Sequence, residues 1–220
     1  MPDNTLTKQE KPTNDASSSR TFRWDEVKGV LEGMEEAQIR EIKTAPNIGR
    51  LHWLPTIKYE VVLSLYESRW HVVKGNRNNV QSDGATTEPD VLLHSHPIDE
   101  RYDACECLFP SPADYYYIKN KAKNLIVSDF GITRYWQVET DPGNRAIEDI
   151  IFSLNPVVFV DLESYLPFLE GIVGARYEIY PWDQAHEQEL RQFLRDAGEG
   201  YEHHLGEQMT VQKLKALLRP

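Results

Sequence analysis

The chain has 220 residues, 40% of them hydrophobic and 27% charged, a balance typical of a globular domain rather than a disordered or membrane-embedded chain. The formal net charge of -11 at pH 7 argues against nucleic-acid binding, because phosphates attract basic surfaces. Two cysteines spaced i, i+2 cannot staple a secreted scaffold, and the sequence has no signal core and no membrane-length apolar run, so we expect a cytoplasmic protein without membrane contact.

The N-terminal stretch is polar and is followed by a predicted helix. Residues 1–20 are rich in Ser, Thr, Asn, Pro and charged residues, so we expect a disordered leader. A helix is predicted from Trp24, because apolar residues recur at helical spacing between Val27 and Met34. Pro46 ends this helix at the latest.

The hydrophobic period then changes to an alternating one. Residues 59–65 alternate between apolar and polar side chains, which predicts a strand with one buried face. Residues 69–74 form a second predicted strand that pairs with the first through a short turn, and residues 75–90 have the composition of a loop. A short buried run at residues 91–93 ends in a His-Ser-His-Pro segment that starts at His94.

The second half of the chain contains further predicted strands and helices. A helix is predicted to open at Ser111, and residues 124–130 and 132–138 are predicted strands joined at Gly131. The expected elements farther along are a strand at residues 157–160 and helices at residues 187–197 and 210–218, the last capped by Thr210. We therefore expect a domain over residues 21–155 and a mainly helical C-terminal extension over residues 156–220.

The first candidate ligands are two histidines at the end of a predicted strand. Residues i and i+2 of a strand point to the same face, roughly 7 Å apart. His94 and His96 can therefore both reach one metal ion at about 2.0–2.1 Å. Pro97 then turns the chain away, because it has no N–H for the ladder. The alternative interpretation is a chance His-x-His in an exposed turn.

The second candidate group lies at the start of the next predicted helix. Ser111 is followed by a proline and, three residues later, by Asp114, which is close to a capping box. Helix-start chemistry alone, worth about 1 kcal/mol, would explain these residues. The functional interpretation adds that the Asp114 carboxylate can supply a third metal ligand.

Together, these segments resemble the motif of the JAMM (MPN+) metallopeptidase family, His-x-His-Pro followed by Pro-Ser-x-x-Asp. The resemblance implies that His94, His96 and Asp114 hold Zn²⁺, with water in the fourth position. It also implies that Ser111 helps to stabilise the tetrahedral intermediate. The family's general base is a Glu at the head of an upstream hydrophobic strand.

Two residues compete for the role of general base. Glu60 heads a Val-Val-Leu-Ser-Leu run similar to the family's Glu-Val-x-Gly-Leu-Leu segment, although Ser64 and its neighbours lack the family's Gly. Glu67 is seven residues farther along, on the opposite face of a regular strand and near the predicted turn. We favour Glu60. For either residue, a solvated strand position is the alternative.

The resemblance covers roughly residues 24–140 and implies the fold. It predicts an α/β protein with a JAB/MPN-like curved mixed β-sheet flanked by helices, a cytidine-deaminase-like architecture. One departure is that 17 residues separate His96 from Asp114, several more than in the family's motif. The additional segment, residues 98–108, contains Cys105 and Cys107 and is either part of the substrate groove or a harmless longer loop. A second zinc at the two cysteines would need further ligands.

The implied function is that of a zinc-dependent peptidase or isopeptidase. Its expected partner is a protein or peptide substrate, and the resemblance favours removal of ubiquitin-like modifiers. One alternative is a non-catalytic MPN-type scaffold within a protein complex, and another is a zinc hydrolase acting on a small-molecule amide. No feature of the sequence indicates an oligomeric state.

Overall fold

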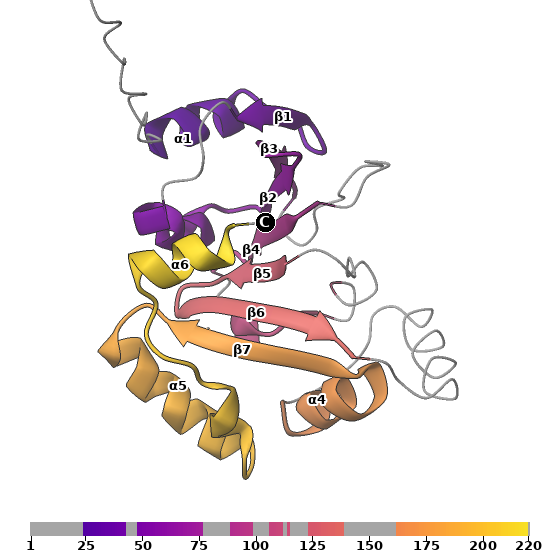
Figure 1. The fold of residues 1–220 in the computed structure, drawn as a ribbon, viewed down its shortest axis with the longest axis vertical. Helices are drawn as coiled ribbons and strands as arrows, with labels where there is room; N and C mark the ends of the chain where they lie inside the picture. The colour runs from indigo at the N-terminus through magenta and orange to yellow at the C-terminus, as the bar shows by residue number, and fades with distance from the viewer. Residues whose placement is uncertain are drawn as a thin grey trace, which may run out of the picture.

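The computed structural model of the protein describes residues 24–42, 48–76, 89–98, 106–111, 114, 123–138 and 162–219. Within these ranges, seven strands form one sheet in the order β1-β3-β2-β4-β5-β6-β7 (Figure 1). Neighbouring strands are antiparallel except β4 and β5, which run parallel. The α/β class and the mixed, mainly antiparallel sheet are therefore confirmed. The strands are β1 (Ile39–Ile42), β2 (Val61–Tyr66), β3 (Arg69–Lys74), β4 (Val91–Ser95), β5 (Lys123–Val127), β6 (Gly131–Gln137) and β7 (Ala175–Pro181).

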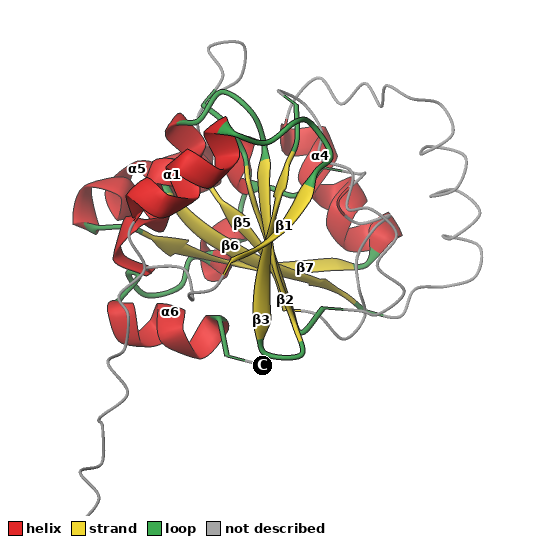
Figure 2. Cartoon of the chain, turned by 90° about the horizontal axis from the view of Figure 1, so that it is seen from above, coloured by secondary structure: helices red, strands yellow, loops and turns green. Residues whose placement is uncertain are grey.

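Helices pack on both faces of this sheet, which is strongly twisted between β3 and β7 (Figure 2). One face forms a first core with α1 (Trp24–Glu32), the 3₁₀ segment η1 (Ile48–Thr56) and α6 (Val211–Leu217). The opposite face forms a second core with α4 (Leu162–Phe168), the π-helix η3 (Leu169–Val173) and α5 (Gln184–Ala197). Two further 3₁₀ segments are η2 (Glu106–Leu108) and η4 (Tyr201–His204).

The first helix ends well before Pro46, its latest predicted end. Val27 and Leu31 are buried as expected, and α1 ends at Glu32. The Lys74 ammonium donates to the carbonyl oxygens of Leu31 and Met34 and so caps the end of the helix. The chain then forms the edge strand β1, which the sequence analysis missed because three of its four residues are exposed.

The central strand β2 is buried on both faces, not on one. All residues from Val61 to Leu65 are buried, including the hydroxyl-bearing Ser64. Val61, Leu63 and Leu65 belong to the first core, and Val62 and Ser64 on the opposite face are buried as well. The alternation in the sequence predicts the strand correctly but does not predict that its second face is buried.

Both predicted hairpins are present. β2 and β3 pair antiparallel through Glu67 and Ser68, which have φ values of 47° and 67°, the left-handed geometry of a two-residue hairpin turn. β5 and β6 form the second hairpin. The strands are joined by residues 128–130, and Gly131, the predicted joint, is the first residue of β6. Glycine is required there, because a Cβ would collide with the carbonyl oxygen of Tyr180 on β7.

The C-terminal region contributes a strand to the sheet. β7 pairs with β6 along its whole length, and this strand was not predicted from the sequence. The predicted helix at residues 187–197 is confirmed as α5, but it begins earlier, because Asp183 accepts hydrogen bonds from the first-turn N–H groups. The last predicted helix is confirmed as α6, and Thr210 caps it by accepting from the Lys213 N–H.

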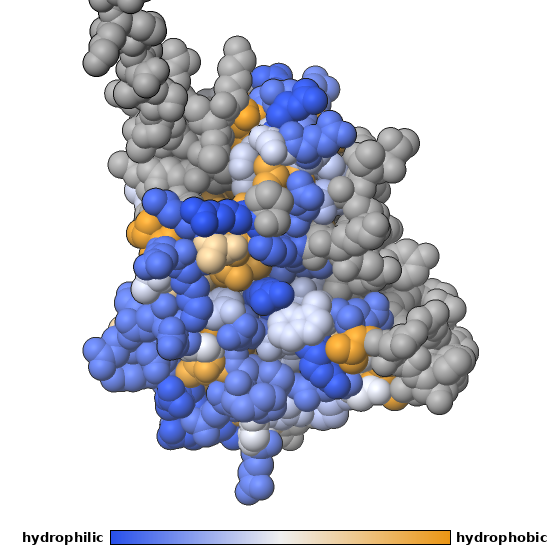
Figure 3. Space-filling view, in the orientation of Figure 1, coloured by the Kyte–Doolittle hydropathy of each residue, from blue (hydrophilic) through white to orange (hydrophobic). Residues whose placement is uncertain are grey.

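Several predictions lie outside the described residues. These are the leader at residues 1–20, the boundary near residue 155, the strand at residues 157–160 and the helix beyond Asp114. Asp114 itself is described and is helical. Within the described part of the chain, no helix has the length and apolar character needed to cross a membrane. The face shown in Figure 3 is mostly hydrophilic where it is described, with apolar residues in small, separate patches.

Candidate metal centre

The end of β4 brings His94 and His96 together. The two Nε2 atoms lie 3.1 Å apart, and the His94 side chain is buried. The His96 N–H donates to the carbonyl oxygen of Val127, so this residue still pairs with β5 beyond the end of β4. Both rings therefore point to the same side of the sheet, as the i, i+2 spacing predicts.

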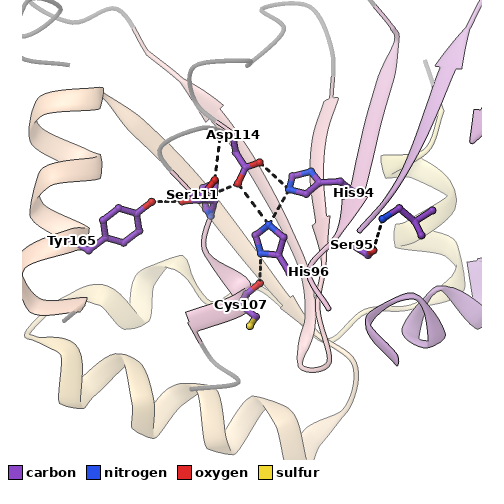
Figure 4. Close-up of polar contacts among 9 residues, drawn as sticks. His94, Ser95, His96, Cys107, Ser111, Asp114 and Tyr165 are labelled. Atoms are coloured by element: carbon purple, nitrogen blue, oxygen red, sulfur yellow. Dashed lines mark hydrogen bonds and ion pairs between the residues drawn. The ribbon is translucent and has the colours of Figure 1, made fainter. Parts of the chain in front are cut away.

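The residue between the histidines joins the start of β2 to the end of β4. Ser95 is completely buried, and its Oγ accepts a hydrogen bond of 3.0 Å from the Val61 N–H. In Figure 4, Ser95 lies away from the two imidazoles, on the side of this contact. The bond fixes the chain directly after Glu60 against the histidine strand.

Asp114 faces both histidines from the start of the following helix. Its Oδ1 lies 3.1 Å from His94 Nε2, and its Oδ2 lies 3.7 Å from His96 Nε2 (Figure 4). The capping box is also present: the Ser111 N–H donates to Asp114 Oδ2 at 2.6 Å, and the Asp114 N–H lies 3.3 Å from Ser111 Oγ. The capping and ligand interpretations are therefore compatible, because the capping hydrogen bonds orient the Asp114 carboxylate toward the two histidines.

The spacing of these three side chains suits a small tetrahedral ion. Ligands about 2.0–2.1 Å from a tetrahedral zinc lie about 3.3 Å from one another. The His94–His96 N–N separation and the His94 Nε2–Asp114 Oδ1 separation, 3.1 Å each, are close to that value, and the second carboxylate oxygen lies 3.7 Å from His96 Nε2. Within the described ranges, His94, His96 and Asp114 are the group of His, Cys, Asp and Glu residues placed to hold a metal ion.

A main-chain carbonyl sets the tautomer of His96. Its Nδ1 lies 2.9 Å from the carbonyl oxygen of Cys107. A carbonyl only accepts hydrogen bonds, so Nδ1 carries a proton, and Nε2, on the side of Asp114 and His94, is the nitrogen that can bind a metal ion once its own proton is lost. Metal-binding histidines are commonly oriented in this way.

Glu60 lies within electrostatic reach of the three candidate ligands. It directly precedes β2, where its own N–H donates to the Asn76 carbonyl oxygen and its carbonyl accepts from the Gly75 N–H. Burial raises the pKa of the Glu60 carboxyl, nearby His96 and His94 lower it, and Asp114 raises it, with a net increase. A partly buried carboxyl with increased proton affinity is suited to accept and release a proton.

The rival acid lies elsewhere. Glu67 is in the β2–β3 turn, where its side chain is 79% exposed and pairs with Arg69. Seven residues of extended chain at about 3.3 Å each separate it from Glu60 by about 23 Å. The antiparallel β2–β4 register, with Val62 opposite His94, puts Glu60 at the end of β2 that lies beside the histidines, whereas Glu67 is at the opposite end.

The charges of the candidate ligands stabilise one another, which shifts the pKa values of His96 and Asp114 in opposite directions. Burial lowers the pKa of His96, but its hydrogen bond to Asp114, the charges of Asp114 and Glu60, and the Cys107 carbonyl outweigh burial and raise it. Burial alone would raise the pKa of Asp114, yet His94 and His96 hold it well below its usual value. The site therefore favours an ionised Asp114 carboxylate beside a protonated His96 ring. A bound metal ion would supply the positive charge in place of that proton.

Zinc affinity is expected to increase with pH because of this proton. The stabilisation from the raised His96 pKa is complete below the unfolded value near 6.5 and is lost as pH rises through the folded value. Metal binding needs the neutral ring, so the apparent affinity should rise about tenfold per pH unit below the folded pKa and then level off. Competition titrations at about pH 6, 7 and 8 measure this, and a Kd independent of pH would contradict it.

The segment inserted between His96 and Asp114 is described in part. The Ile98 N–H donates to the Pro55 carbonyl oxygen at 2.9 Å, which ties the start of the segment to η1. Residues 99–105, including Cys105, lie outside the described residues. Cys107 contacts the site through its main-chain carbonyl, a contribution that no sequence motif signals.

Comparison of the chain with protein-family models, with curated proteins and with solved structures gives no match in any of the three.

Proposed function

We propose that the protein is a zinc-dependent peptidase or isopeptidase of the JAMM type, acting on a protein or peptide substrate. The observation that carries this proposal is the convergence of His94, His96 and Asp114 beside Glu60. These residues come from the start of β2, the end of β4 and a helix start after the inserted loop. Two imidazoles and one carboxylate, with no fourth protein ligand among the described residues, are typical of catalytic zinc sites rather than structural ones.

The donor set favours zinc over harder cations. Imidazole nitrogens suit zinc and other late transition metals, whereas magnesium and calcium prefer sites made wholly of oxygen. The separations near 3.1–3.7 Å also fit tetrahedral coordination, as described above. When bound, zinc would supply a Lewis acid that lowers the pKa of water and polarises the scissile carbonyl.

The side chains of this protein would handle the proton and the developing charge. Glu60 would accept a proton on its carboxylate from the attacking water and pass it to the leaving amine. Ser111 accepts from the Asp114 N–H through Oγ, so its hydroxyl hydrogen is not used in that bond and can donate to the developing oxyanion. Such a donor typically contributes a few kcal/mol.

The arrangement along the chain supports the family resemblance. Glu60 directly precedes β2, β3 is its hairpin partner, and β4 ends at the histidine pair. Asp114 follows in helical conformation, and β5 runs parallel to β4 before the β5–β6 hairpin. This is the order of elements that the resemblance implies.

A substrate panel with metal control tests the proposal. Zinc-loaded protein would be incubated with ubiquitin-like fusions joined through a lysine side chain, with fusions joined through the main chain, and with small amides. Cleavage of the lysine-linked fusion that a chelator abolishes and zinc restores is the expected result. Cleavage of small amides alone would indicate a different hydrolase, and zinc binding without any cleavage would favour a non-catalytic scaffold.

A further inference from the structure

The loop that leads into Ser111 touches the metal centre at both of its ends. At one end, the Cys107 carbonyl oxygen accepts from His96 Nδ1. At the other end, Ser111 and Asp114 exchange the two capping hydrogen bonds. The position of this loop therefore controls the orientation of two of the three candidate ligands.

The middle of the loop is anchored in the second core. Leu108 and Phe109 are 0% and 3% exposed and pack with α4, η3, β7 and α5. The Phe109 ring meets Tyr177 of β7 edge to face, with ring centroids 5.4 Å apart, and stacks on Phe193 of α5. Elements of the C-terminal region, including β7 and α5, thus pack against the loop and restrain it.

One polar contact from the same region reaches the residue directly before Ser111. The Tyr165 hydroxyl, on α4, donates to the Pro110 carbonyl oxygen, and Figure 4 shows this contact beside Ser111 and Asp114. Burial, and then the nearby Asp114 carboxylate, raise the pKa of Tyr165 well above its usual value. The hydroxyl is therefore kept protonated and able to donate.

We propose that Tyr165 is a positioning residue of the metal centre, through which α4 holds the loop at residues 107–111 in the geometry that orients Asp114 and His96. The proposal rests on the metal site of the proposed function, not on its peptidase activity. Without the hydroxyl, the carbonyl of the buried residue Pro110 loses a partner, and the Ser111–Asp114 cap is free to shift. Outer-shell groups of this kind typically change metal affinity by about 10–100-fold when they are removed.

The proposal assigns a role to residues beyond the family resemblance. The resemblance ends near residue 140, whereas α4 begins at Leu162 and β7 ends at Pro181. If Tyr165 positions the centre, the C-terminal region is part of the metal site rather than a separable addition.

The test compares Tyr165→Phe with a matched control, Tyr180→Phe, in the full chain. Tyr180 is buried, whereas Tyr165 is partly buried, and it likewise donates its hydroxyl, to the Glu178 side chain, but it belongs to the first core. Zinc Kd would be measured by competition, and the visible absorption of the Co²⁺-loaded protein would report the ligand geometry. We expect Tyr165→Phe to raise the zinc Kd about 10–100-fold and to alter the Co²⁺ spectrum, while Tyr180→Phe changes neither.

A wild-type Kd and Co²⁺ spectrum in folded Tyr165→Phe would overturn this proposal alone. Failure of the wild-type chain to bind Zn²⁺ or Co²⁺ would overturn the metal site as well. If Tyr165→Phe does not fold, Tyr165→Met removes the same hydroxyl and fills the space with a flexible side chain. Weaker zinc binding by folded Tyr165→Met supports the proposal, and a wild-type zinc Kd in that variant overturns it.

Discussion

Glu60→Gln is expected to lower kcat by about 10²–10⁴-fold, the usual contribution of a general base. Glutamine has nearly the same size but cannot take the proton from water. Zinc content should stay at the wild-type level, since Glu60 is not one of the candidate ligands. Turnover of the substrate found in the panel, together with metal analysis of the same preparation, measures both quantities.

The matched control is Glu67→Gln, which removes the same charge from the other end of β2. Its side chain is exposed in the hairpin turn, and its loss breaks a surface ion pair with Arg69 that is worth little. We expect full activity from this variant. Full activity in Glu60→Gln combined with a large loss in Glu67→Gln would reverse the assignment of the base.

Asp114→Asn is expected to weaken zinc binding by more than the roughly 10–100-fold typical of outer-shell changes, because it removes the anionic ligand itself. The neutral amide is a poor ligand, and it presents an N–H₂ group where His94 and His96 now face an oxygen. Competition titration of the metal-free protein gives the change in Kd directly.

Asp183→Asn is the control for Asp114→Asn, because the two acids occupy similar local settings. Asp183 caps α5 and lies 2.9 Å from His186 Nδ1, so it too is a helix-start carboxylate beside a histidine. It is not part of the metal-binding group, so its replacement should leave the zinc Kd unchanged. Equal zinc affinities in the two variants would remove Asp114 from the ligand set.

Five of the seven strands were predicted from alternation or from short apolar runs, and β1 and β7 were missed. β2 was found because apolar and polar side chains alternate over residues 59–65, and a short polar turn then indicates β3 as its partner. β1 has one buried residue in four, so its pairing with β3 is decided by tertiary contact rather than by its own pattern. β7 does carry a signal that was missed, since Ala175, Tyr177 and Ile179 alternate with charged residues.

The candidate ligands could be proposed because their side chains form a spaced motif. His94, His96 and Asp114 lie together in the structure, as the motif predicts. The supporting contacts could not be proposed, because each involves a main-chain group: Cys107 contributes a carbonyl, and Tyr165 binds the carbonyl of Pro110. Main-chain acceptors exist at every residue, so residue identity gives no indication of where they are used.

The most direct test of the central claim is elemental analysis of the purified protein beside its His94→Ala/His96→Ala variant. The site predicts about one zinc per chain in the wild-type protein and none in the variant, because two of its three protein ligands are removed. A wild-type protein without zinc after supplementation, or a variant that keeps the full amount, would contradict the proposed metal centre.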